Sequence, residues 1–237
     1  MDKRTIAIII AILGALFIFT MKADEILTIV LTLPALILAI TFHEFAHAKT
    51  AELLGDPTPR RQGRITLNPL KHVSLMGLVS LFFLRIGWGN PVMINPNNFT
   101  KIKNKKLGEA IVALAGPLMN IILAFIIILV YGIFLKYNIT IGVGNFAIII
   151  QNIILAMISV NLGLAVFNLL PFPPLDGFSI FALVLPKKVT YWIESNQNII
   201  SIIFLILIWT GLLSRITLPF LTYLTNAILR FVAVLIG

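Results

Sequence analysis

Long apolar runs separated by short polar stretches make up most of the chain. A helix needs about 20 apolar residues to cross the hydrocarbon core of a bilayer. Six runs approach or exceed that length, at residues 5–21, 26–54, 108–135, 146–170, 199–213 and 218–236. The pattern predicts an all-α polytopic membrane protein with about six transmembrane helices, of which the fifth is short.

The segment between the second and third runs has a different pattern. Residues 59–100 are rich in arginine, glycine and proline. Their apolar stretch, 73–86, is too short to span a bilayer and is interrupted at Gly77. We therefore expect a re-entrant segment of extended or β-like structure here, in contact with the rest of the protein.

Composition supports the membrane assignment. Hydrophobic residues make up 59% of the chain and charged residues 11%, with a mean hydropathy of +1.03, whereas soluble domains carry about 25% charged residues. Asp2-Lys3-Arg4 precedes the first run as in a signal peptide, but Thr20-Met21-Lys22 offers no small-residue cleavage site. We expect one membrane-embedded domain over residues 1–237, with a core at about 26–186 and flanking spans at 5–21 and 199–236.

The chain has a net charge of +9, and the distribution of its basic residues between the two sides of a membrane indicates its orientation. No basic helix or aromatic-interleaved basic patch is present, so we expect no nucleic-acid partner. If the N-terminus is cytoplasmic, fourteen of the eighteen Lys and Arg residues fall on the cytoplasmic side, in segments 3–4, 49–106 and 187–188. Both termini and the polar end of the second run are then predicted to be cytoplasmic.

That polar end carries the chemistry-bearing residues. His43 and His47 are four residues apart, so on a helix they share a face and can bind one zinc ion while Glu44 acts as general base. A hydrogen-bonded polar cluster is the alternative. Ionisable groups inside a membrane span are costly and are functional by default, which favours the metal site. The absence of cysteine excludes thiolate ligands.

A catalytic zinc ion usually has three protein ligands and one water. Asp176 is one candidate for the third ligand, because it ends the fourth run in the rigid segment Pro171-Phe172-Pro173-Pro174-Leu175-Asp176-Gly177. An Asp-Gly pair can also be only a turn. His72 is the competing candidate, and the residues by themselves leave both open.

The ordered set of motifs resembles the site-2 proteases, a family of intramembrane zinc metalloproteases. The resemblance covers about residues 41–177 and rests on the histidine motif, Gly63 to Pro69, Gly87 to Pro91 with Asn95-Pro96, Ala115 to Asn120, and Asn168 to Gly177. Phe178 stands where many members carry a small residue. The chain shows no PDZ-like or CBS-like domain, as in minimal prokaryotic members.

The resemblance implies a three-helix catalytic core with one Zn²⁺ per chain. His43, His47 and Asp176 would bind the zinc, and Glu44 would activate the water. Asp176 is thereby preferred to His72.

Two asparagines have open roles. Asn168 is our candidate for an oxyanion or substrate contact, and an interhelical hydrogen bond is equally open. For Asn120 the structural role is favoured. Gly116-Pro117 suggests close helix packing or a kink.

The implied reaction is regulated intramembrane proteolysis of a single-span substrate in a prokaryotic cytoplasmic membrane. A helical substrate must unwind before its peptide bond is accessible, and residues 64–96 are the candidate strand to pair with it. A non-proteolytic metal transporter or inactive protease is the alternative, although transport needs no general base. A prenyl-protein protease would use a glutamate as third ligand, and no well-placed glutamate follows.

Overall fold

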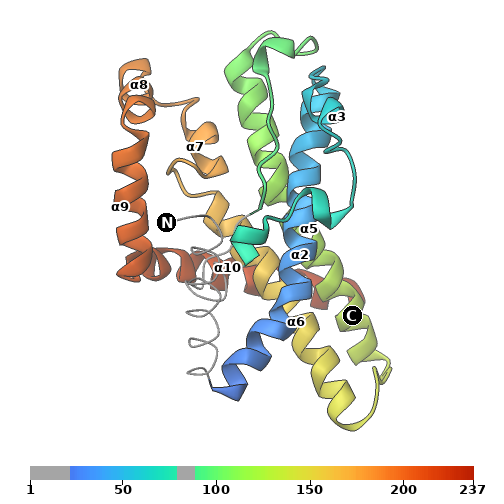
Figure 1. Cartoon of the computed structure of the whole chain (residues 1–237). Helices are drawn as coiled ribbons and strands as arrows, with labels where there is room; N and C mark the ends of the chain where they lie inside the picture. The colour runs from blue at the N-terminus through green and yellow to red at the C-terminus, as the bar shows by residue number, and fades with distance from the viewer. Residues whose placement is uncertain (1–21, 79–88) are drawn as a thin grey trace, which may run out of the picture.

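The structure, a computed structural model, describes residues 22–78 and 89–237 (Figure 1). Its elements are α2 (Ala23–Leu53), α3 (Thr58–Arg61), η1 (Pro69–Lys71), η2 (Pro96–Asn98), α5 (Lys105–Lys136), α6 (Gly144–Asn168), α7 (Asp176–Phe181), α8 (Lys187–Ser195), α9 (Gln197–Trp209) and α10 (Leu212–Ile236). In these two ranges the regular structure is helical, which confirms the all-α prediction.

Four helices of the described chain are long and apolar enough to cross a membrane: α2, α5, α6 and α10. The run predicted as a fifth span at 199–213 corresponds to α9, whose 13 residues are too few to span alone. An 80° bend separates α9 from α8, so the two helices make a fifth span only as a broken pair. The first predicted span, 5–21, lies outside the described residues, and six spans are not confirmed.

The predicted re-entrant segment at 73–86 falls largely on residues 79–88, which lie outside the described ranges. Its described flanks meet in an isolated antiparallel bridge between Val73 and Gly89. A β-like re-entrant element is therefore not confirmed.

Helices α2, α5 and α6 pack against one another and form the central bundle, and α7 packs on α5 (Figure 1). Ala35, Ala39, Ala48 and Ala51 of α2 are completely buried, because small residues let helix backbones approach closely. Helix α10 packs on α5 and α6, in a core cluster of Ala124, Ile128, Leu162, Ile228 and Val232.

The end of α2 has the hydrogen bonds of a Schellman motif. The Gly55 N–H donates to the Glu52 carbonyl at 2.9 Å and the Asp56 N–H donates to the Ala51 carbonyl at 3.0 Å. Gly55 has a φ of +107°, and a Cβ there would lie 2.9 Å from the backbone nitrogen of Thr100. This turn ends the helix and places Asp56 in the protein interior.

The carboxylate of Asp56 is completely buried and fastens the segment around η2 to the end of α2. Its Oδ2 accepts from the Asn95 N–H at 2.6 Å. Its Oδ1 accepts from the Thr58 N–H at 3.0 Å, the Thr58 hydroxyl at 2.6 Å and the Asn98 Nδ2 at 2.9 Å. Segment 92–98 is thus held against α2, beside the histidine motif.

The side on which the termini lie stays a prediction. Lys136 Nζ donates to the Ile236 carbonyl, so the last turn of α10 lies at the C-terminal end of α5. In Figure 1 that end is remote from α3 and α8. This contact does not support a C-terminus on the same side as the histidine motif.

We predict that Asp56→Asn lowers the thermal unfolding midpoint of the detergent-solubilised protein at pH 7. The carboxamide cannot accept all four hydrogen bonds, and an unsatisfied buried donor costs about 1–3 kcal/mol. Burial raises the pKa of Asp56, but hydrogen bonds from Asn95, Thr58 and Asn98 outweigh it and lower the pKa below its usual value. The stabilisation is therefore present above the unfolded value of about 3.9 and is lost as the pH falls below it.

The difference between wild type and Asp56→Asn should accordingly shrink as the pH is lowered through that range. Asp24→Asn, which changes an exposed carboxylate in the first turn of α2, is the matched control. Equal midpoints for wild type and Asp56→Asn at pH 7 would show that this carboxylate does not hold the segment.

Candidate metal centre

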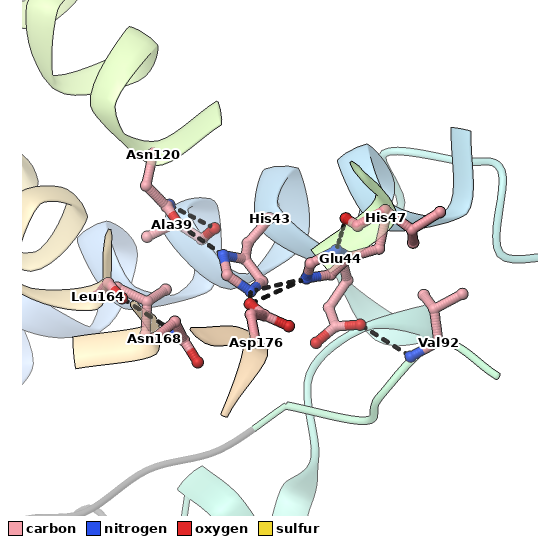
Figure 2. Close-up of polar contacts among 10 residues, drawn as sticks. Ala39, His43, Glu44, His47, Val92, Asn120, Leu164, Asn168 and Asp176 are labelled. Atoms are coloured by element: carbon pink, nitrogen blue, oxygen red, sulfur yellow. Dashed lines mark hydrogen bonds and ion pairs between the residues drawn. The ribbon is translucent and has the colours of Figure 1, made fainter. Parts of the chain in front are cut away.

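Two side chains of α2, His43 and His47, meet Asp176 from the start of α7 (Figure 2). The Nε2 atoms of His43 and His47 lie 3.0 Å apart. Asp176 Oδ2 lies 3.1 Å from the first and 3.3 Å from the second. Two atoms bound tetrahedrally to zinc at about 2.0–2.1 Å are roughly 3.3 Å apart. The three side chains, which we call the metal group, could therefore hold a metal ion.

Hydrogen bonds on the outer side of each imidazole determine its tautomer. His47 Nδ1 lies 2.7 Å from the Val112 carbonyl, which can only accept, so this nitrogen carries the hydrogen. His43 Nδ1 lies 2.6 Å from Asn120 Oδ1 and donates in the same way. Each neutral ring then has a lone pair on Nε2, directed at the other ring and at Asp176.

Within the described residues, the buried Asp176 Oδ2 has no hydrogen-bond partner beside the two imidazoles. When both rings are neutral, two imidazole lone pairs and a carboxylate oxygen meet here without a proton between them, in a partly apolar interior. Such an arrangement is strongly unfavourable unless a cation occupies it. The donor set of two imidazoles and one carboxylate suits zinc and leaves a position for water.

Asp176 reaches the histidines because of the turn that follows α6. Helix α6 ends at Asn168, the proline-rich segment reverses the chain, and α7 begins at Asp176 itself. The backbone of Leu169 and Leu170 packs so closely on Gly177 that a Cβ would not fit there. The Asp-Gly pair therefore brings the carboxylate back into the bundle.

Glu44 lies beside the metal group and faces the same cavity. Its Oε2 accepts from the Val92 N–H at 2.9 Å, which fixes the carboxylate and leaves Oε1 to accept a proton (Figure 2). The cavity has a volume of about 590 Å³ and is lined by His43, Glu44, His47 and Asp176, together with residues of segment 91–94, α5, α7 and α8. Arg64 Nη2 donates to the Pro91 carbonyl at 3.0 Å and supports this segment.

The other residues singled out in the sequence lie in different places. Asn168 lines the cavity, and its Nδ2 donates to the Leu164 carbonyl at 3.0 Å; its contact with an oxyanion or substrate stays a prediction. His72 is buried outside the metal group, and its Nε2 donates to the Thr66 carbonyl at 2.7 Å. Asn120 contacts His43 directly.

Some contacts in this site could not be inferred from the sequence. The Val92 amide and the Val112 carbonyl belong to the backbone, so no residue type marks them. Asp56 was detectable in principle, because Asp56-Pro57-Thr58 directly after a helix stop favours an Asx-type turn. Asn161 was detectable as a polar residue within an apolar run.

Comparison with known proteins decides the family. A profile of Peptidase family M50 matches residues 139–210. The chain is 36% identical over 201 residues to "Putative zinc metalloprotease YwhC" of Bacillus subtilis, which covers 82% of this chain and 87% of that protein. The chain belongs to peptidase family M50. This M50 protein is a zinc metalloprotease with several membrane helices, and its resemblance to site-2 proteases is confirmed.

An archaeal protein gives a second match to the M50 chain. "Putative zinc metalloprotease MJ0611" of Methanocaldococcus jannaschii is 29% identical over 182 residues, or 74% of this chain and 82% of that protein. No solved structure gives a significant match.

We predict that Gly116→Ala weakens zinc binding at least about tenfold. A Cβ at position 116 of α5 would lie 2.6 Å from His43 Cε1 and closer still to His47 Nε2. Overpacking of this kind costs about 1–3 kcal/mol, here at two of the three grouped side chains. The measurement is zinc competition with a chelator.

Gly163→Ala in α6 is the matched control, because a Cβ there meets nothing within 4 Å. Wild-type zinc affinity in Gly116→Ala would show that α5 does not need to approach the histidines this closely.

Proposed function

We propose that this M50 protease hydrolyses a peptide bond in or next to the transmembrane segment of a single-span membrane protein. In this proposal His43, His47 and Asp176 hold one zinc ion, and Glu44 is the general base. The observation that carries it is the convergence of three ligand atoms, two of them on a helix long enough to span a membrane, beside Glu44 and in a cavity large enough for a peptide. This is the chemistry that regulated intramembrane proteolysis requires.

Zinc, when bound, lowers the pKa of a water molecule to about 7 and polarises the scissile carbonyl. Glu44 Oε1 accepts the proton that the water loses as its oxygen bonds to the carbonyl carbon. The same carboxyl group then gives this proton to the nitrogen as the C–N bond breaks. Val92 holds Oε2 throughout, so that the carboxylate keeps one orientation.

In this proposal Asn168 also donates a hydrogen bond to the substrate. A carboxamide nitrogen carries two hydrogens, and only one is needed for the bond to the Leu164 carbonyl. The other can donate to the carbonyl oxygen of the substrate as negative charge develops on it. Its position on the cavity wall supports this assignment.

The substrate helix must unwind locally, because its peptide carbonyls are otherwise hydrogen-bonded within the helix. Within the predicted strand region 64–96, segment 91–95 is the best-supported pairing edge. Arg64, Glu44 and Asp56 fix its backbone at Pro91, Val92 and Asn95. A rigid extended edge beside the metal group favours strand addition by an unwound substrate.

We place the active site near the cytoplasmic face. In Figure 1, α3, α8 and the start of α5 lie at the end of the molecule where α2 ends, and their sequences carry Arg60, Arg61, Lys105, Lys106, Lys187 and Lys188; basic loops are retained in the cytoplasm. The N-terminus is assigned to the same side. The predicted cytoplasmic C-terminus stays a prediction, and the contact between Lys136 and Ile236 does not support it.

The competing function is that of a metal transporter or an inactive protease. A substitution of Glu44 tests whether the protein is instead an active protease. We predict that Glu44→Gln abolishes cleavage while one zinc ion per chain remains bound. Loss of a general base typically costs about 10²–10⁴-fold in rate. Cleavage is measured on a panel of single-span substrates in proteoliposomes, each with and without helix-breaking residues near the cytoplasmic face.

Glu52→Gln is the control, since this carboxylate pairs with Lys49 and Arg60 and does not line the cavity. Faster cleavage of the helix-broken substrates is expected. Wild-type cleavage by Glu44→Gln would contradict the mechanism, and zinc flux without cleavage by the wild type would establish the transporter.

A further inference from the structure

Asn120 of α5 lies where α2, α5 and α6 meet, and its side chain is completely buried. Its Oδ1 accepts from His43 Nδ1 at 2.6 Å. Its Nδ2 donates to the Ala39 carbonyl at 3.1 Å and to Asn161 Oδ1 at 2.9 Å. One carboxamide thus connects a proposed zinc ligand on α2 with a polar residue on α6; its bonds to His43 and Ala39 are drawn in Figure 2.

The orientation of this carboxamide is determined by its partners. Asn161 Nδ2 donates to the Met157 carbonyl at 2.8 Å, which turns Asn161 Oδ1 toward Asn120. The Ala39 carbonyl is also an acceptor. If the Asn120 amide were reversed, its oxygen would face two acceptors, and each buried mismatch would cost about 1–3 kcal/mol. The hydrogen bonds therefore have one direction, from His43 through Asn120 and Asn161 to Met157.

The direction of these hydrogen bonds determines which nitrogen of His43 carries the hydrogen. Because Asn120 presents an oxygen, the hydrogen of His43 stays on Nδ1, and the lone pair of Nε2 points at His47 and Asp176. The backbone carbonyl of Val112 does the same for His47. Partners of this kind commonly fix the tautomer and ring orientation of metal-bound histidines.

We propose that Asn120, held by Asn161, is a positioning residue that selects the metal-binding tautomer of His43. The inference rests on the proposed function, because it takes His43 as a zinc ligand. Asn120 does not line the cavity, so it acts through His43 and not on the substrate. A merely structural asparagine would hold the helices together without affecting the imidazole.

The first test reads the tautomers directly, in the metal-free full-length protein. The chain has three histidines, so ¹⁵N-histidine NMR gives three imidazoles, assigned with single His→Gln variants. His43 and His47 are expected to carry hydrogen on Nδ1, and His72 on Nε2, which bonds to the Thr66 carbonyl. In Asn120→Leu, His43 should become a mixture of tautomers while His47 and His72 keep theirs.

The second test measures zinc affinity by competition with a chelator. Asn120→Leu should bind about 10–100-fold more weakly, as found when such partners are removed. Asn120→Asp keeps an acceptor for His43 Nδ1, so the folded variant should keep the hydrogen of His43 on Nδ1, although it loses stability because its second oxygen faces the Ala39 carbonyl and Asn161 Oδ1. Thr41→Val is the matched control, since it removes a buried hydroxyl two residues from His43 that bonds only to the Ile37 carbonyl.

If Asn120→Leu does not fold, Asn161→Leu takes its place, because it leaves the acceptor but removes what orients it. A tautomer mixture at His43 in that variant would support the proposal. An unchanged Nδ1–H at His43 together with wild-type zinc affinity, in either folded variant, would overturn it. Absence of zinc binding or of proteolysis in the wild type would instead overturn the proposed function, since the tautomers are read without metal or substrate.

Discussion

Three ligand atoms directed at one point inside an apolar helix bundle, from His43, His47 and Asp176, are the constraint on which the rest of this structure depends. Water could relieve such a cluster at a surface, but burial makes it costly unless a cation is bound. The outer nitrogen of each imidazole is already hydrogen-bonded, to Asn120 for His43 and to Val112 for His47. Only the inner atoms are left to bind a metal, so zinc binding and formation of the bundle are expected to be coupled.

The surrounding elements each serve this convergence. Gly116 lets α5 approach the imidazoles, and the turn after α6 returns Asp176 to them. Asn120 of α5 bonds both to Asn161 of α6 and to His43 and Ala39 of α2, and so connects the three helices beside the metal group. The Schellman motif at the end of α2 buries Asp56, which fastens the segment that in turn orients Glu44. The proposed ligands and the proposed general base are thus positioned by separate sets of contacts.

Much of this arrangement could be predicted from sequence, because the bilayer restricts the possibilities. The run 26–54 predicts α2 (Ala23–Leu53) closely, since only a helix satisfies its backbone in lipid. The histidine spacing pointed to His43 and His47, and the resemblance to site-2 proteases preferred Asp176 to His72 as the third residue of the group that the structure brings together. The broken form of the fifth span could not be predicted, because the 80° bend lies at Asn196, before the apolar run 199–213 begins. The contacts of Val92 and Val112 are made by backbone atoms, which every residue type has.

The most direct measurement of the central claim is X-ray absorption at the zinc edge of the purified protein in detergent. Ligation by His43, His47 and Asp176 predicts two imidazoles, with the remaining ligands oxygen, at about 2.0–2.1 Å. His72→Gln should leave this spectrum unchanged, and Asp176→Ala should alter its oxygen shell. A spectrum with three imidazoles, or one that changes in His72→Gln and not in Asp176→Ala, would contradict the proposed metal centre.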